Sequence, residues 1–372
     1  MHTITDIPAF ARKHKGTLLR GLVRGYAPYA LGRQLQLLQK HQLNALVLLT
    51  LERPADLGRL LGMPLLELEE LINHPQYTSY SIPKKKGGER RIAAPDGRLK
   101  VAQKRLNFFL QAYYLWIKPE EVHGFVINPR YLRKKCNIAE NAAAHAGKKQ
   151  VLNIDLKDFF PSISAKRVKQ LFVSPYFNFA EPIANALALL TTFERHLPIG
   201  SPSSPVIANF VCLALDSDLR EWAAANGWTY TRYADDLTFS SDTTISKDSI
   251  LDTINVIGRH GFTINGKKLR LAASNRRQTV TGLTVNKQVN VDRRLLKKIR
   301  AMLHDLTANG VGQAARRHFG VQGEVGTRYQ TKFMNRLEGY INFVGQVRGK
   351  DDALYLRYRK HLTAAQSNQR VF

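Results

Sequence analysis

The stretch that decides the fold is VLNIDLKDFFPSI (151–163), together with YTRYADDLTFS (230–240) farther along the chain. In the first stretch, a short apolar run predicts a buried strand that ends at Asp155. In the second, residues 228–233 and 237–241 alternate in polarity around Ala234-Asp235-Asp236, the pattern of a hairpin with these residues at its tip. The sequence therefore places three carboxylates, Asp155, Asp235 and Asp236, at the ends of predicted strands.

The rest of the chain predicts an α+β fold. Leucines at three- and four-residue spacings indicate helices through residues 1–75, and residues 99–116, 187–192, 206–225, 246–260 and most of 292–349 also suit helices. Residues 77–95 predict two short strands, and 267–273 and 278–285 one strand each. Strands alternating with helices in the middle of the chain, with helical segments at both ends, are typical of the α+β class.

Charge indicates a polyanionic partner. The 372 residues include 56 Lys and Arg against 29 Asp and Glu, a formal net charge of +27. The excess is clustered, with eleven basic residues and one acidic residue between positions 265 and 300. Such fields attract nucleic acids, and counterion release drives the binding. The alternative is a charge that serves only solubility, and the clustering argues against it.

Composition excludes several other classes. A hydrophobic fraction of 44% is that of a packed chain and excludes wholesale disorder. We expect no membrane association, because no apolar run is long enough to span a bilayer and no basic helix carries a bulky apolar face. The two cysteines, Cys136 and Cys212, are too few for a disulfide framework or a zinc site, so a reducing, cytoplasmic setting is expected.

The three carboxylates suggest phosphoryl chemistry. Adjacent acids repel each other unless a cation lies between them, although aspartates in a turn are also common for conformational reasons. Nucleotide addition develops charge on both the attacking and the leaving oxygen, and two metal ions about 3.5–4 Å apart stabilise both. Because Mg²⁺ prefers carboxylate oxygens, converging acids beside a basic cleft suit this reaction.

Ordered strings along the chain strengthen this hypothesis. The two stretches above, with LPIGSPSSPVIAN (197–209) and HGFTINGKKLRL (260–271), resemble the successive palm motifs of a reverse transcriptase. IPKKKGGERRIAAPDGRLKVAQKRL (82–106) resembles the fingers motif that precedes them. Asn141-Ala-Ala-Ala-His145 resembles the Asn-Ala-x-x-His signature of bacterial retron reverse transcriptases, and Val280-Thr281-Gly282 their Val-Thr-Gly triplet. The resemblance covers roughly residues 77–350.

The resemblance implies a right-hand polymerase fold of fingers, palm with an antiparallel sheet, and helical thumb. The expected domains are an N-terminal helical extension (1–76), the fingers (77–150), the palm (151–285, with an inserted fingers segment at about 165–195), and the thumb with a C-terminal tail (286–372).

It also implies a function. The expected reaction is DNA synthesis from dNTPs on an RNA template, with two Mg²⁺ ions. A retron enzyme pairs with its own structured noncoding RNA and is expected to prime from the 2′-hydroxyl of a guanosine, which leaves a branched RNA–DNA hybrid, msDNA. The family is associated with antiphage defence in the bacterial cytoplasm, which implies a separate effector protein as a further partner.

Catalytic roles follow from the resemblance residue by residue. Asp155, Asp235 and Asp236 match the catalytic metal ligands, whereas Asp158 is not counted among them. For nucleotide binding, Arg91 matches the basic residue that holds the triphosphate, and Lys268 matches the lysine that helps pyrophosphate leave. Phe160 matches the aromatic residue that excludes a ribose 2′-OH, and Phe159 is expected in the core.

RNA binding is assigned to Asn141, His145, Val280, Thr281 and Gly282, and the basic helix that begins near residue 293 is the expected thumb surface for RNA. Lys84, Lys85 and Lys86 are candidates for contact with nucleic acid or nucleotide. The chain departs from a common pattern at Ile199, where many reverse transcriptases carry a glutamine that positions the nucleotide or template.

Two alternatives stay open at this point. The chain resembles other bacterial reverse transcriptases as well, from group II introns or other defence lineages, although an intron protein would normally carry a maturase domain after the thumb. A non-catalytic RNA-binding scaffold is the second alternative, and the three retained acids argue against it.

Overall fold

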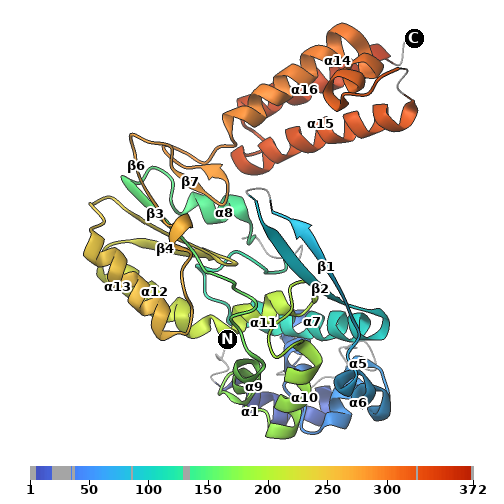
Figure 1. The fold of residues 1–372 in the computed structure, drawn as a ribbon, viewed down its shortest axis with the longest axis vertical. Helices are drawn as coiled ribbons and strands as arrows, with labels where there is room; N and C mark the ends of the chain where they lie inside the picture. Colours follow the sequence, from blue (N-terminus) through green and yellow to red (C-terminus); the bar gives the residue numbers. More distant parts are fainter. Residues whose placement is uncertain are drawn as a thin grey trace. The chain divides into compact units, whose positions relative to one another are not determined.

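The computed structural model describes residues 6–18, 35, 38–84, 87–128, 135–323 and 326–369. The chain forms two compact units. Unit 1 consists of Met1–Cys136, Ile154–Leu237 and Ser246–Leu269, and unit 2 consists of Asn137–Asn153, Thr238–Ile245 and Arg270–Phe372. Helices and strands mix along the chain as expected for an α+β fold, and Figure 1 labels them.

Unit 1 holds most of the helices. They are α1 (Ile7–Lys13), α4 (Lys40–Leu48), α5 (Pro54–Leu61), α6 (Leu65–Asn73), α7 (Gly97–Ile117), α9 (Ala165–Val173), α10 (Glu181–Thr191), α11 (Ser204–Val211), α12 (Leu213–Ala225) and α13 (Lys247–Arg259). The helical character expected for residues 1–75 is confirmed in α1, α4, α5 and α6. Residues 1–5, 19–34 and 36–37 of that segment lie outside the described residues.

The ends of α5 show how the sequence sets these helices. Pro54 is its first residue, where a missing N–H costs nothing and the fixed φ suits a helix. Gly62 follows its last residue with φ +69°, a left-handed conformation that favours glycine. The longer α7 is held by burial instead, because Leu99, Leu106 and Leu110 are all buried on it.

The two strands expected within 77–95 are confirmed as the antiparallel hairpin of β1 (Tyr77–Pro83) and β2 (Glu89–Pro95), in a register that pairs Tyr77 with Pro95. Lys85 and Lys86, in its turn, lie outside the described residues.

A four-stranded sheet runs through the middle of the chain, in the order β4-β5-β3-β6. Its strands are β3 (Gln150–Asp155), β4 (Thr229–Tyr233), β5 (Asp236–Ser241) and β6 (Arg270–Ala273). The pairing of β3 with β6 is antiparallel, from Gln150 opposite Ala273 to Asn153 opposite Arg270. Helix α12 packs on β4, the strand at one end of this order, and on α13 (Figure 1).

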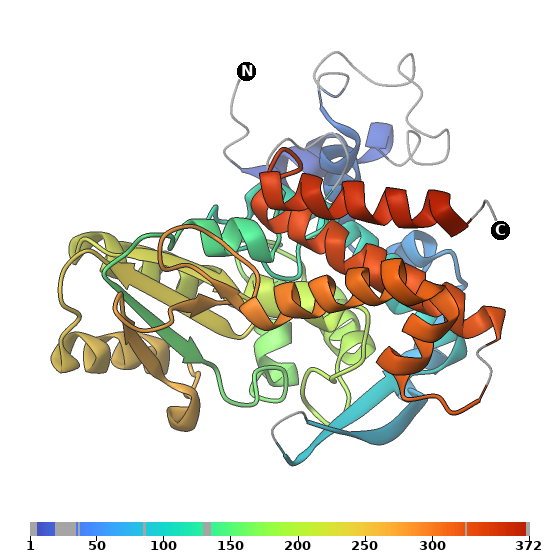
Figure 2. The same cartoon turned by 90° about the horizontal axis from the view of Figure 1, so that it is seen from above.

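Unit 2 is built around three long helices, α14 (Arg293–Phe319), α15 (Thr327–Arg348) and α16 (Ala353–Gln369), which lie side by side in Figures 1 and 2. Their core includes Met302, Phe333 and Ile341, all fully buried. Gly310 interrupts α14 with non-helical dihedral angles, φ 73° and ψ 168°. The same core takes in residues of α8 (Ile138–Ala143) and of a small hairpin, β7 (Thr279–Val280) and β8 (Leu283–Thr284). No described helix is both long and apolar enough to cross a lipid bilayer.

Three predictions of local structure need correction. The expected single strand over 278–285 is the hairpin β7–β8, because Thr281 and Gly282 adopt φ +47° and +83° and reverse the chain. The residues on either side alternate in polarity as in a single strand, so the sequence pattern does not reveal this turn. The expected helix over 206–225 is two helices that meet at Cys212. Helices α9 and α16 occupy segments for which the sequence predicted no regular element.

Candidate active site

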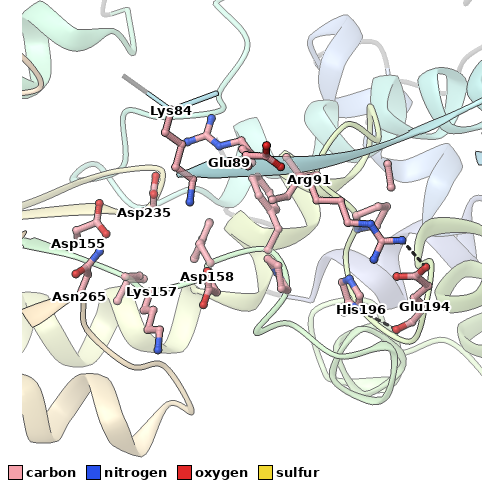
Figure 3. A pocket seen from close by; sticks show the side chains of 18 of the residues that line it. Lys84, Glu89, Arg91, Asp155, Lys157, Asp158, Glu194, His196, Asp235 and Asn265 are labelled. Carbon is pink, nitrogen blue, oxygen red and sulfur yellow. Dashed lines mark hydrogen bonds and ion pairs between the residues drawn. The ribbon is translucent and has the colours of Figure 1, made fainter. Parts of the chain in front are cut away.

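A pocket of about 580 Å³ in unit 1 gathers most of the predicted catalytic and nucleotide-binding residues. Its lining includes the following predicted site residues: Arg91, Asp155, Phe160, Asp235 and Lys268. Figure 3 shows the carboxylates of Asp155 and Asp235 as neighbours in one part of this pocket, with Arg91 and Glu194 farther along it. The sequence places these residues between positions 91 and 268, so only the fold brings them together.

Backbone hydrogen bonds fix the two acids. Asp155 ends β3, and its carbonyl accepts a hydrogen bond from Asn265 N at 2.8 Å. The next residue, Leu156, donates its N–H to the carbonyl of Asp235 at 2.9 Å. Each acid is therefore tied through the main chain to the strand or loop that carries the other.

The turn that carries Asp235 is tight. Ala234, just before it, has φ +60°, which is uncommon for a residue with a side chain. Gly124 lies against this turn so closely that a Cβ atom there would come within 2.9 Å of the carbonyl carbon of Tyr233. Asp236 begins β5 and does not line the pocket.

Desolvation and repulsion raise the pKa values of both acids in the turn. The pKa of Asp236 rises to about 6, because protein atoms displace water around its carboxyl group and because Asp235 and Asp155 repel its charge. The pKa of Asp235 is also raised, mainly by burial and further by Asp155. Nearby positive charge offsets this only in part, which is the setting that favours a bound cation.

Lys268 supplies part of that charge. Its Nζ lies 2.6 Å from Asp155 Oδ1, and this hydrogen bond raises the pKa of the lysine. The carboxylate side chain is mostly buried, at 12% exposed, whereas the lysine side chain is 54% exposed. Lys268 therefore stays protonated and can leave Asp155 without losing contact with water.

Arg91 has an acidic partner that the sequence did not predict. Its Nη2 donates to Glu194 Oε1 at 2.9 Å, and Glu194 lines the same pocket. Glu194 and Arg195 have φ +49° and +68°, so a turn of two left-handed residues presents this carboxylate. No motif of the sequence marks Glu194. Lys84 also lines the pocket, as its candidacy for nucleotide contact requires.

Phe159 and Phe160 are neighbours in sequence with different environments. Phe159 also lines the pocket, but it is buried, at 4% exposed, and packs near Phe262. Phe160 lines the pocket, with its ring centroid 5.7 Å from that of Phe125. Ile199 lines the pocket as well, and its carbonyl accepts a hydrogen bond from Ala93 N at 2.7 Å. The pocket therefore has an apolar side chain at the position where the resemblance led us to expect a glutamine.

The residues assigned to RNA belong to unit 2, and none of them lines this pocket. Asn141, His145 and Val280 are buried, at 1%, 0% and 0% exposed. His145 Nδ1 lies 2.7 Å from Ser240 Oγ, and Val280 belongs to the apolar core. Thr281 and Gly282 form the tip of the β7–β8 hairpin, where Thr281 Oγ1 donates to the carbonyl of Ile138 at 3.2 Å. RNA contact by these five residues stays a prediction. His145 and Val280 have contacts within the fold, whereas neither polar atom of the buried Asn141 side chain has a hydrogen-bond partner among the described residues.

Metal binding can be tested against the donor atoms present. Among the described residues, no three His, Cys, Asp or Glu side chains form a complete metal site. Asp155 and Asp235 nevertheless line one pocket, with Asp236 beside them. Mg²⁺ keeps much of its coordination shell for water and substrate phosphates. A few carboxylates in an open pocket therefore fit an ion whose shell is completed by a substrate.

Comparison with known proteins connects this pocket to one family. The family model described as reverse transcriptase (RNA-dependent DNA polymerase) matches residues 82–290. The chain is 36% identical over 268 residues to the retron Mx65 reverse transcriptase of Myxococcus xanthus, covering 67% of this chain and 60% of that protein. It is 33% identical over 238 residues to the retron Ec86 reverse transcriptase of Escherichia coli, covering 62% of this chain and 70% of that protein.

A third relative, the retron Mx162 reverse transcriptase of Myxococcus xanthus, is 32% identical over 307 residues, covering 68% of this chain and 59% of that protein. The chain thus spans about three fifths of the length of both Myxococcus relatives. The family model spans more than half of the chain and contains every acid of the pocket. Because the relative from Escherichia coli is also matched over more than two thirds of its length, this chain belongs to the bacterial retron reverse transcriptases and has their right-hand polymerase fold.

Proposed function

We propose that the protein is an RNA-directed DNA polymerase whose active site is the unit 1 pocket. The observation that carries the proposal is the meeting of Asp155 and Asp235 in a pocket that also holds Lys84, Arg91 and Lys268. Asp235, an acid of raised pKa, lies beside several cations, which suits a reaction in which a polyphosphate enters and pyrophosphate leaves.

The three acids hold the cofactor in this proposal. Two Mg²⁺ ions at Asp155, Asp235 and Asp236 would stabilise negative charge on the attacking 3′-hydroxyl and on the leaving oxygen. To bind metal, Asp155 would release the ammonium group of Lys268. The released ammonium group can donate a proton to pyrophosphate.

The other pocket residues select and orient the nucleotide. Arg91 exchanges the carboxylate of Glu194 for the triphosphate, whose oxygens match the paired donors of a guanidinium. The ring of Phe160 lies where a ribose 2′-OH would clash with it, so dNTPs are favoured over rNTPs.

The retron-specific part of the proposal concerns RNA. The enzyme reverse transcribes its cognate structured noncoding RNA, msr-msd, from the 2′-OH of a guanosine and leaves branched msDNA, in the cytoplasm of a bacterium. Its biological role is antiphage defence with a separate effector protein. The retron relatives, the net charge of +27 and the two signature strings support this. Thr281 and Gly282 contact the RNA from the hairpin tip, His145 and Val280 hold the surrounding segments in place, and Asn141 remains a candidate for RNA contact.

Two measurements test the proposal. Primer extension on poly(rA)/oligo(dT) with Mg²⁺ should give DNA, and its absence would leave the scaffold alternative. Sequencing DNA that is covalently joined to co-purified RNA should find a 2′-linked guanosine. An ordinary 3′-primed product would instead indicate another bacterial reverse transcriptase.

Recognition of the RNA has its own test. Binding of the cognate RNA and of a scrambled RNA of equal length should be compared across a salt series, because charge alone gives strongly salt-dependent binding. Shape-specific contacts should let the cognate RNA retain its advantage at higher salt. Parallel curves of equal affinity would contradict the proposed recognition of a cognate RNA.

A further inference from the structure

A fully buried ion pair lies behind the turn that carries Asp235. Arg232 on β4 and Asp216 on α12 both have side chains that are 0% exposed. Arg232 Nε donates to Asp216 Oδ1 at 2.7 Å, and Nη2 donates to Oδ2 at 2.6 Å, a bidentate pair. The hydroxyl of Tyr230 donates to Oδ1 of the same carboxylate at 2.8 Å. Both carboxylate oxygens are thus satisfied in the interior.

The remaining donor of the guanidinium points to the turn. Arg232 Nη1 donates to the carbonyl of Ala234 at 3.2 Å and to Asn209 Oδ1 at 2.9 Å. Asn209 in turn donates its Nδ2 to the carbonyl of Gly124 at 3.0 Å, beside the same turn. One buried side chain therefore joins α11, α12 and the Gly124 segment to the peptide group that immediately precedes Asp235.

Stability alone is a weak reason for such an arrangement. Removing two charges from water is costly, and apolar replacements of a buried ion pair are often as stable as the pair. What a guanidinium adds is direction, because its planar fork fixes several acceptors at once. Here one of those acceptors belongs to a left-handed residue, Ala234, whose conformation the local sequence does not favour.

We propose that Arg232 is a positioning residue that holds the Ala234–Asp235 peptide, and with it the carboxylate of Asp235, in the geometry that DNA synthesis requires. The inference rests on the proposed function. On its other side, the carbonyl of Asp235 accepts the hydrogen bond of Leu156 N. Arg232 therefore supplies the second of two fixed points, and a displacement of about 1 Å at such a site can lower the rate about 10²-fold.

The decisive variant removes both charges, because removing one alone leaves the other buried and unpaired. Asp216→Leu with Arg232→Met should retain a melting temperature and an RNA affinity close to those of the wild type. Its kcat for primer extension should fall about tenfold or more, with KM for dNTP little changed, because geometry rather than binding is lost. Mn²⁺, used as a spectroscopic probe, should bind the double variant more weakly than the wild type.

Two single variants complete the design. Tyr230→Phe removes a hydrogen bond to Asp216 and leaves the contact with Ala234, so it should lower the melting temperature and keep kcat. Arg232→Lys keeps the charge opposite Asp216 but loses the fork, so it should lower kcat while remaining folded. If the double variant fails to fold, the contrast between these two decides.

A folded double variant with wild-type kcat and Mn²⁺ affinity would overturn the inference, as would equal kcat losses in Tyr230→Phe and Arg232→Lys. A wild-type chain without polymerase activity would refute the proposed function instead. In that case the Mn²⁺ affinities of the same proteins still decide whether Arg232 positions the acid.

Discussion

The acids of the unit 1 pocket and the retron signature residues of unit 2 lie in opposite environments. Asp155, Asp235 and Lys268 line a pocket, and the charge of Asp155 helps to raise the pKa values of Asp235 and Lys268. Asn141, His145 and Val280 are buried at 1% exposed or less. Both sets come from equally short strings. A short sequence signature can therefore mark residues that contact a ligand directly. It can also mark residues whose side chains hold the backbone of a ligand-binding segment in place.

The largest effect is expected at the pocket. Asp235→Asn should lower DNA synthesis by about 10²-fold or more, because the loss of one carboxylate removes charge from the metal site. Asp158→Asn is the matched control, since Asp158 lines the same pocket and its φ of +45° suits asparagine. Primer extension rates and melting curves measure both. Wild-type rates for Asp235→Asn would mean that this pocket acid does not act in catalysis.

Phe160→Ala should admit ribonucleotides, with discrimination against rNTPs falling about tenfold or more as the steric clash is removed. Phe159→Ala is the contrasting variant: it empties a core position and should cost about 3–5 kcal/mol of stability without changing selectivity. Steady-state incorporation of rNTP and dNTP, together with urea unfolding, separates the two. Unchanged selectivity in Phe160→Ala would assign this ring to the core.

His145→Ala tests whether a buried signature residue of unit 2 stabilises the fold. Loss of the hydrogen bond to Ser240 should lower the free energy of unfolding by about 1–3 kcal/mol, measured by urea denaturation. Ser240→Ala removes the same hydrogen bond from its other side and should have a similar effect. If His145→Ala kept full stability and yet narrowed the preference for cognate RNA, its role would be direct contact and not support.

The smallest effect is expected for Glu194→Gln. Its ion pair with Arg91 is exposed, at 44% and 63%, so it is worth at most about 1 kcal/mol, and KM for dNTP should fall no more than about fivefold. Glu181→Gln breaks a comparable exposed pair with Lys169 and should leave KM unchanged. A rise in KM for Glu194→Gln would mean that Glu194 orients Arg91 rather than competing for it.

Much of the fold followed from local patterns. The hairpin of β1 and β2, helix α7, the strands around Ala234 and helix α13 were all predicted, because each has a clear period and clear ends. The β7–β8 hairpin was missed because the alternation continues through Thr281 and Gly282. The break at Cys212 was missed because apolar spacing continues across it.

Some residues of the candidate site were also predicted from the sequence, and others were not. Ordered motifs pointed to Asp155, Asp235, Lys268, Arg91 and Phe160, and the pocket unites them. Glu194 and Asp216 were not predicted, since no string marks them, and Asn209, the last residue of the string 197–209, was given no role. The roles of all three arise only from tertiary contacts. The burial of Asn141 and His145 could not be predicted either, because polar residues four apart suit an exposed helix face equally well.

Gly124 carries no functional group, yet its lack of a side chain lets its segment lie directly against the turn of Tyr233 and Ala234. In a saturation library selected for DNA synthesis, position 124 should therefore be nearly as intolerant as the positions of the acids. A library that keeps only the acidic motif fixed would therefore lose activity through substitutions of Gly124, although Gly124 has no side chain that could take part in the reaction. Fewer positions around this pocket can therefore be substituted than its reactive side chains alone would suggest.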